Sequence, residues 1–153
     1  MGDVVKPKAY LDDGRALLVD THVWIWYVDG APLPPLLDVL LRRANGEHRL
    51  LVSDISAWEI ATKAGKGKLD LAIDSALWIH RAERMPGFTL VPLDRELLLL
   101  STRLPGALHG DPTDRMIVAT AILRACPLVT AHRRIIEYAR REKQVALSVI
   151  DAR

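Results

Sequence analysis

Short apolar segments recur along the chain, and polar segments with helical spacing separate them. Continuous runs of four or five apolar residues without alternation are typical of strands that are covered on both faces, as in parallel sheets. The sequence predicts such strands over residues 16–20, 49–53, 88–91, 127–130 and 146–150.

Helix signals lie between these strands. Pro34 and Pro35 suit a first helical turn, Ser56, Asp74 and Asp94 suit N-caps, and Pro112 opens a helix that is apolar almost all round. The expected helices cover residues 22–29, 34–46, 56–63, 74–85, 94–104, 112–123 and 133–143. Alternating strands and helices predict the α/β class, as an α/β/α sandwich around a central, mostly parallel sheet.

The first 15 residues combine glycine, proline and mixed charges without periodicity. This composition predicts a flexible N-terminal extension over residues 1–15, outside the fold. The remaining residues, 16–153, have the length of a single domain.

Composition narrows the function classes. Half of the residues are hydrophobic and 26% are charged, which excludes a disordered chain or a coiled coil. No apolar run approaches the roughly 20 residues of a membrane span, and the N-terminus lacks a secretory signal pattern. The single Cys126 predicts a buried, reduced thiol in a cytoplasmic protein, and the net charge of +2 permits a nucleic-acid partner without requiring one.

Acidic residues stand where predicted strands end or helices begin. Asp20 closes the first strand, Glu59 follows the second, and Asp111 and Asp114 flank the start of the helix at Pro112. A parallel sheet brings such ends to one edge, where open α/β folds bind their ligands. Crowded carboxylates repel one another unless a cation holds them, and oxygen ligands suit Mg²⁺ or Mn²⁺. The pattern therefore predicts a metal site for phosphodiester chemistry.

Each acid also has a purely structural interpretation. Asp20 and Asp111 are suited to cap helices, and Asp114 is favoured in a first helical turn by the helix dipole. Ser56 and Glu59 have the spacing of a capping box. Local sequence does not choose between capping and metal binding.

Three segments together resemble the PIN domain family, and most closely the VapC-type toxins of VapBC toxin–antitoxin pairs. They are residues 18–26 (LVDTHVWIW), 55–61 (ISAWEIA) and 111–121 (DPTDRMIVATA), followed by LVTA at residues 128–131. The resemblance extends over residues 17–150. It implies a Mg²⁺- or Mn²⁺-dependent endoribonuclease that inhibits translation as the toxin of a type II pair. It also implies a VapB-type antitoxin partner and a homodimer.

The resemblance assigns roles by position. Asp20, Glu59 and Asp114 match the first three acidic, metal-binding positions of the family, and Asp111 matches an additional acid of the Asp-Pro-x-Asp-Arg motif. Many members have an aspartate at the fourth position, where this chain has His132. An imidazole can ligate Mn²⁺ or position a water but cannot replace the missing charge, which Asp111 would then supply.

RNA contacts are expected from side chains around these acids. The candidates are Thr21, Ser56, Lys63, Arg115, Thr130 and His132. Each hydroxyl also suits a cap or turn, and His132 also suits a solvated loop. The four tryptophans are interpreted as core or as a partner-binding groove in preference to base stacking.

Two rival functions remain open at this level. One is a housekeeping PIN nuclease in RNA maturation, and the other is a catalytically weakened PIN fold kept for RNA or protein binding, which His132 favours. A phosphohydrolase with an aspartyl nucleophile is set aside, because it needs a second carboxylate where this chain has His22.

Overall fold

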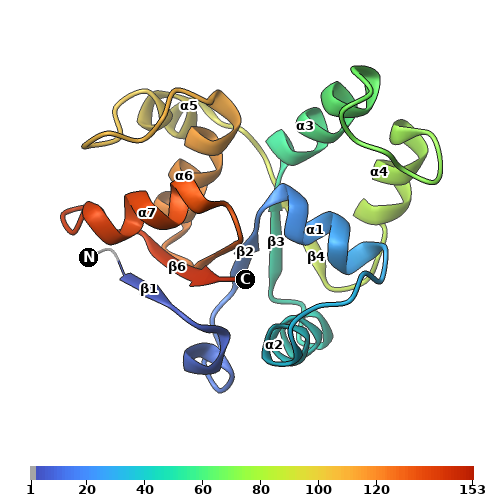
Figure 1. Cartoon of the computed structure of the whole chain (residues 1–153), viewed down its shortest axis with the longest axis horizontal. Helices are drawn as coiled ribbons and strands as arrows, with labels where there is room; N and C mark the ends of the chain where they lie inside the picture. Colours follow the sequence, from blue (N-terminus) through green and yellow to red (C-terminus); the bar gives the residue numbers. More distant parts are fainter. Residues whose placement is uncertain (1–2) are drawn as a thin grey trace.

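A single parallel sheet forms the centre of the protein in the computed structural model, which describes residues 3–153 (Figure 1). The strand order is β1-β6-β5-β2-β3-β4, and every described strand pair is parallel. The strands are β1 (Asp3–Val5), β2 (Leu17–Val19), β3 (Leu50–Ser53), β4 (Phe88–Val91), β5 (Leu128–Thr130) and β6 (Ser148–Asp151).

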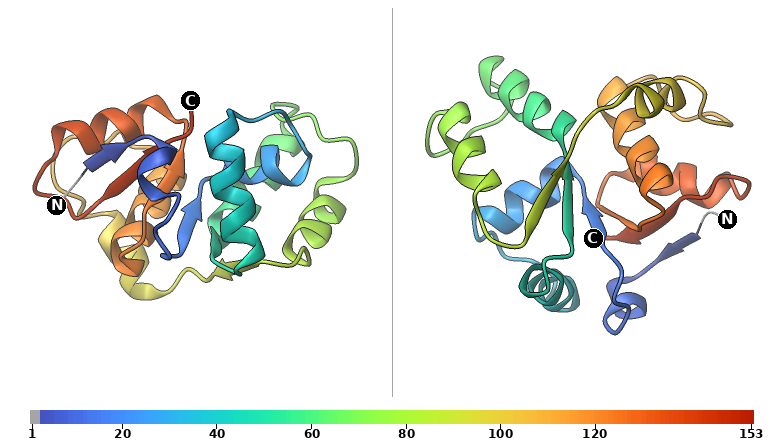
Figure 2. Two further views of the ribbon diagram at one scale, coloured as in Figure 1. Left: turned by 90° about the horizontal axis from the view of Figure 1, so that it is seen from below. Right: turned by 180° about the vertical axis from the view of Figure 1, so that it is seen from behind.

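Helices cover both faces of this sheet, as the α/β/α prediction requires. They are η1 (Pro7–Tyr10), α1 (Thr21–Val28), α2 (Pro35–Gly46), α3 (Asp54–Gly65), α4 (Ser75–Glu83), α5 (Arg95–Ser101), α6 (Pro112–Arg124) and α7 (Arg133–Arg141). In Figure 2, α6 and α7 lie together on one side, apart from α1 and α2. Within residues 3–153 no helix is long and apolar enough to cross a membrane.

Alternation along the strands produces two hydrophobic cores. Leu17 and Val19 of β2 pack with α1 and α2, whereas Leu18 between them packs with α6 and α7. Successive strand side chains point to opposite faces, so a three-residue buried strand serves both layers. This explains why the predicted strands are continuously apolar.

The N-terminal segment differs from its prediction. Asp3–Val5 forms the edge strand β1, which pairs with β6, and the buried Pro7 opens η1. The prediction of a flexible extension is therefore wrong for residues 3–10, while residues 1 and 2 lie outside the described part. The pairing partner of β1 lies at the other end of the sequence, which a local pattern does not reveal.

Helix caps are mostly as predicted. Asp20, Asp74, Asp94 and Asp111 each accept backbone N–H groups at the start of α1, α4, α5 and α6. The predicted cap of α3 is wrong, because α3 follows β3 without a loop and Ser53 is its N-cap.

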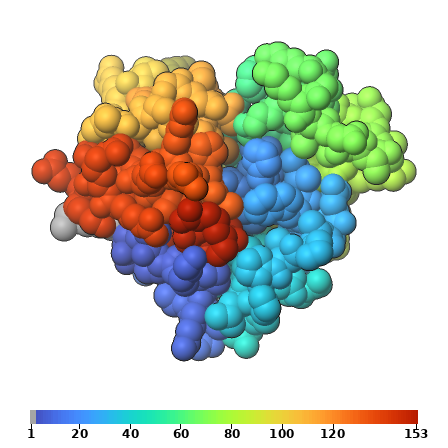
Figure 3. Space-filling view, in the orientation of Figure 1, coloured from blue at the N-terminus to red at the C-terminus, as the bar shows by residue number. Residues whose placement is uncertain are grey.

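Tryptophans occupy two kinds of environment. Trp24 and Trp78 are buried and meet edge to face with ring centroids 5.2 Å apart, as expected for core residues. Trp58 of α3 is 59% exposed, so a core assignment is wrong for it. Figure 3 shows the surfaces of α6 (orange), α3 (green) and α1 (blue) meeting on the face of the molecule that carries the site described next.

Candidate active site

A small cleft at the carboxyl edge of the sheet gathers the predicted acids. Its volume is about 70 Å³, and it lies among α1, α3, the start of α6 and the start of α7. It is lined by Asp20, Thr21, His22, Glu59, Lys63, Asp111, Asp114, Ile117 and His132. Four carboxylates from three separate parts of the chain thus line one cleft, and carboxylate oxygens are ligands that hard divalent ions prefer.

Asp20 caps a helix and lines the cleft at the same time. Its Oδ1 accepts the N–H of Val23 at 2.9 Å, and the Thr130 hydroxyl donates to its Oδ2. The side chain is 5% exposed. Burial raises the pKa of Asp20, and the hydrogen bonds from Thr130 and Val23 oppose that rise. The carboxylate is thereby held between the N-terminus of α1 and the end of β5.

Asp114 lies in the first turn of α6 and is contacted by two imidazoles. Its Oδ2 is 2.6 Å from Nε2 of His109 and 3.1 Å from Nε2 of His132. The two rings stack in parallel, with centroids 5.5 Å apart and an interplanar angle of 3°. Burial raises the pKa of Asp114, while the hydrogen bond with His109 and the charge of His132 lower it. Asp114 is therefore not a surface acid of a helix start.

The carboxylate of Glu59 forms an ion pair with a lysine and does not cap a helix. Its Oε2 lies 2.9 Å from Nζ of Lys63, one helical turn away. The capping-box interpretation with Ser56 is wrong, because Ser56 lies inside α3 and its Oγ accepts the Thr21 hydroxyl at 2.8 Å. Glu59 is only 7% exposed and faces the cleft.

A second, larger groove continues from the cleft along α3. It has a volume of about 180 Å³ and shares Glu59, Lys63 and Asp111 with the cleft. The other lining residues are Trp58, Thr62, Lys66, Lys68 and Thr113. Three lysines and an exposed indole thus lead to an acidic centre.

Five of the six predicted RNA contacts fall into two groups in the structure. Thr21 and Lys63 line the cleft together with His132. Ser56 and Thr130 are fully buried, and their hydroxyls engage other side chains of the site. These two residues support the site from the protein interior.

Arg115 is turned toward the protein interior. Its Nε donates to the carbonyl of Ser101 at 2.8 Å, and its Nη1 donates to the carbonyl of Leu108 at 3.0 Å. The cleft lining does not include it. Arg115 therefore anchors the loop between α5 and α6, which makes a direct RNA contact a poor assignment for it.

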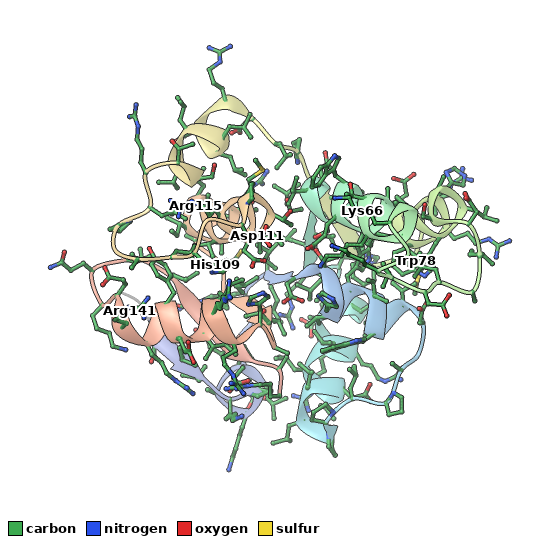
Figure 4. The ribbon with its side chains drawn as sticks, turned by 45° about the horizontal axis from the view of Figure 1, so that its top comes forward. Lys66, Trp78, His109, Asp111, Arg115 and Arg141 are labelled. Atoms are coloured by element: carbon green, nitrogen blue, oxygen red, sulfur yellow. The ribbon has the colours of Figure 1, made fainter. Side chains whose placement is uncertain are left out.

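His109 is the site residue that the sequence did not reveal. It lies in the loop anchored by Arg115, and α7 holds the same loop through Tyr138 and Arg141. The Tyr138 hydroxyl donates to the carbonyl of Pro105 at 2.5 Å, and Nη2 of Arg141 donates to that of Ala107 at 3.0 Å. Figure 4 shows His109 between Asp111 and Arg141. A single histidine in a loop with glycine and proline has no diagnostic spacing, so no sequence signal identifies it.

The residues present fit a divalent cation. The charge of Asp114 raises the pKa of Asp20, and the charge of Asp111 raises that of Asp114. Buried carboxylates that repel one another are stabilised by a cation among them, and their oxygens are ligands that hard ions prefer. His109, Asp114 and His132 also place three ligand atoms within 4.8 Å of one another.

Comparison with known proteins gives the family. The PIN domain family model matches residues 17–141. Ribonuclease VapC22 of Mycobacterium tuberculosis is 34% identical over 122 residues, which cover 78% of this chain and 88% of that protein. The fold is similar to the DNA-bound VapBC2 of Rickettsia felis, with a TM-score of 0.60, 15% identity, and 89% and 99% of the two chains covered. The DNA-bound VapBC of Salmonella typhimurium is similar with a TM-score of 0.61 and 18% identity, and the match covers 88% of this chain and 98% of that chain. The chain therefore belongs to the PIN domain family.

Proposed function

We propose that this protein is an endoribonuclease that depends on Mg²⁺ or Mn²⁺ and acts as the toxin of a type II toxin–antitoxin pair. The observation that carries the proposal is the convergence of Asp20, Glu59, Asp111 and Asp114 on one cleft beside a groove with three lysines. The 34% identity to a protein described as a ribonuclease supports RNA as the substrate. Its action would block translation in the cytoplasm.

Asp20 and Asp114 are the residues best placed to hold the cation, with Glu59 and Asp111 completing the negative centre. When bound, a divalent cation neutralises phosphate charge and lowers the pKa of a water toward neutrality. Thr130 and the backbone N–H of Val23 fix the orientation of the Asp20 carboxylate, so its oxygens need little reorganisation.

The ammonium group of Lys63 has two candidate partners, the Glu59 carboxylate and a substrate phosphate. Its ammonium lies 2.9 Å from the Glu59 carboxylate, and it also borders the lysine groove. A phosphate in the cleft would compete with Glu59 for this cation. Lys63 would therefore orient the scissile phosphate in the cleft.

The lysine groove accounts for RNA binding along α3. Lys66 and Lys68 are exposed there and would neutralise backbone phosphates on one side of the cleft. The exposed indole of Trp58 offers a stacking surface for a base, and stacking is tolerant of sequence. Substrate affinity should accordingly decrease steeply with salt.

The partner would be a VapB-type antitoxin, with a homodimer of this chain as the unit that binds it. The VapBC complexes of R. felis and S. typhimurium, which share the fold, support the antitoxin as partner. Exposed aliphatic side chains on α2, α4 and α5 offer apolar surface for such contacts; they are Leu36, Val39, Leu77, Leu98 and Leu99.

The test is cleavage of total cellular RNA with end mapping, first with added Mg²⁺ or Mn²⁺ and then with a chelator. Cleavage should require the metal and decrease by about 100-fold or more in Asp114→Asn, since a metal stabilises the transition state by several kcal/mol. Glu83→Gln, an exposed change on α4, is the matched control.

Three outcomes would redirect the assignment. Cleavage that persists with chelator removes the metal from the mechanism. RNA binding without cleavage supports the weakened, binding-only PIN fold. Cleavage confined to one precursor RNA supports the housekeeping nuclease.

A further inference from the structure

Two histidines and one aspartate converge beside the acidic cleft. His109 comes from the loop before α6, Asp114 from the first turn of α6, and His132 from the N-cap of α7. Both imidazoles present Nε2 to the same oxygen of Asp114, at 2.6 Å and 3.1 Å. The three ligand atoms all lie within 4.8 Å of one another.

We propose that His109, Asp114 and His132 form a nitrogen-rich metal centre that selects Mn²⁺ and other first-row transition ions over Mg²⁺. The proposal rests on the proposed function: Asp114 is common to both, and the ion that it shares with Asp20 would also take the two imidazoles as ligands.

The chemistry of the ligands gives the selectivity. Mg²⁺ is a hard ion that takes oxygen ligands and keeps several waters. Imidazole suits transition ions, and Mn²⁺ accepts both imidazole and carboxylate. This chain has His132 where many family members have an aspartate, and it adds His109. Both changes therefore weaken Mg²⁺ binding more than Mn²⁺ binding. The histidine in place of the aspartate also lowers the negative charge that would otherwise favour a hard divalent ion.

The geometry matches a shared ion. Two ligand atoms bound to one ion at about 2.1 Å lie roughly 3 Å apart when their bonds are at right angles. The distances from Asp114 Oδ2 to the two Nε2 atoms, 2.6 Å and 3.1 Å, lie on either side of that value.

Each ring has a second nitrogen that can carry the proton when Nε2 binds an ion. Nδ1 of His109 and Nδ1 of His132 are buried and have no hydrogen-bond partner among the described residues. The Asp114 carboxylate favours a proton on each Nε2, and no described group occupies either Nδ1. A metal can displace the proton from Nε2, and the neutral ring then carries it on Nδ1.

The protein positions the ligands before any ion arrives. Arg115 and α7 anchor the loop that carries His109. The backbone N–H of His132 donates at 3.0 Å to the Thr130 hydroxyl oxygen, and this hydroxyl in turn donates to Asp20. The histidine centre is thereby connected to Asp20, the acid held on the neighbouring strand β2.

A purely structural role for the imidazoles makes a different prediction. If His109 and His132 only orient the Asp114 carboxylate, they donate hydrogen bonds and never contact the ion. Electron spin-echo envelope modulation of bound Mn²⁺ distinguishes the two cases, because a directly ligated imidazole nitrogen modulates the echo.

The experiment uses the purified full chain and Mn²⁺ alone, followed by competition with Mg²⁺. We expect nitrogen modulation in the wild type and reduced modulation in both His109→Gln and His132→Asn. Loss of one ligand should lower Mn²⁺ affinity by at least about tenfold, since even outer partners of a ligand contribute about 10–100-fold. His80→Gln, an exposed change on α4, should leave both measurements unchanged.

His132→Asp provides the reverse test. Aspartate suits the N-cap of α7, where His132 makes no side-chain cap bond, so the variant should fold. It should bind Mg²⁺ more tightly and lower the ratio of Mn²⁺ to Mg²⁺ affinity by about tenfold or more. Absence of nitrogen modulation in the wild type, or an unchanged affinity ratio in all three variants, would overturn the proposal.

RNA cleavage is measured separately, so the two proposals fail in different ways. Nitrogen modulation without cleavage keeps the metal centre and refutes the nuclease. Equal cleavage with either ion and no modulation keeps the nuclease and refutes the metal centre.

Discussion

Replacing Asp20 with asparagine separates its two functions, because only one of them needs a charge. Asn and Asp cap helices about equally well, so the bond to the Val23 N–H of α1 should survive. The substitution removes the anion that we assign to metal binding. We therefore expect the metal-free variant to fold normally and to lose its response to Mn²⁺.

The magnitude follows from the contacts of the carboxylate. The Thr130 hydroxyl loses an acceptor, which costs about 1 kcal/mol. Removing a buried anion next to Asp114 offsets this loss, since burial and that neighbour both raise the pKa of Asp20. We expect the free energy of unfolding to change by no more than about 1 kcal/mol, or roughly 2–4 °C in Tm for a domain of this size.

The effect of metal is larger. A ligand at 100 times its Kd stabilises the folded state by about 2.7 kcal/mol, which corresponds to about 5–10 °C in Tm. Saturating Mn²⁺ should raise the Tm of the wild type by this amount and that of Asp20→Asn by almost nothing. Asp70→Asn, an exposed change beyond α3, is the control and should respond like the wild type.

The pH dependence has a definite sign. The carboxyl groups of Asp20 and Asp114 have raised pKa values, so they hold protons in the folded state above the ordinary value of 3.8. The folded state then binds more protons than the unfolded chain. The free energy of unfolding of the metal-free protein should therefore decrease as pH rises from about 4 through the raised pKa values. The decrease should be smaller in Asp20→Asn.

Differential scanning calorimetry with and without Mn²⁺, over a series of pH values, measures all of these quantities. A loss of more than about 2 kcal/mol in the metal-free variant would show that the charge of Asp20 is structural. An undiminished Mn²⁺ response in Asp20→Asn would remove this residue from the metal site.

Other predictions concern residues outside the cleft. Burial raises the pKa of Cys126 to about 11, so the native thiol should not react with a disulfide reagent at pH 8, whereas the urea-unfolded thiol should react fully. Asp151→Asn should lower the free energy of unfolding by about 1 kcal/mol at pH 7, because the hydrogen bond from the partly exposed Arg153 lowers the pKa of Asp151. This contribution is present above the unfolded pKa near 4 and is lost as pH falls toward the folded value, which pH-dependent urea titrations will show. Arg115→Leu should cost about 1–3 kcal/mol in urea unfolding and weaken Mn²⁺ binding, since the Leu108 carbonyl beside His109 loses its donor.

Each of these has a contrary result. Rapid labelling of the folded protein would place Cys126 at the surface. An Asp151→Asn difference that does not decrease at all between pH 7 and pH 2 would assign the effect to packing. Unchanged Mn²⁺ affinity in Arg115→Leu would show that His109 is positioned without that loop anchor.

The layered fold and most helix starts could be predicted from local patterns, because buried parallel strands and aspartate caps have short-range signatures. Asp74, Asp94 and Asp111 cap the helices as expected. β1 could not be predicted, because three residues of edge strand depend on pairing with β6 and have no periodicity of their own. The cap at Ser53 was missed because β3 passes into α3 without a turn.

The convergence of the acids on one cleft was predictable for a similar reason. Asp20, Glu59 and Asp114 follow strand ends or helix starts, which topology brings to one edge. His109 depends on the path of a loop that Arg115, Tyr138 and Arg141 hold through backbone carbonyls. Hydrogen bonds to carbonyls carry no sequence signature at the residue that accepts them, so the histidine pair appears only in three dimensions.

The absence of hairpins among the described strands affects how the chain acquires its activity during synthesis. The Thr130 hydroxyl that fixes Asp20 belongs to a residue 110 positions further along the chain. Parallel strand pairs between distant segments form late and slowly, because the entropy cost of closing the loop comes before the contacts that offset it. We therefore expect the acidic residues of a nascent chain to remain unassembled, without a formed cleft, until residues 128–132 have emerged from the ribosome. If the cleft is the active site, as we propose, we expect catalytic competence to begin only with that late closure.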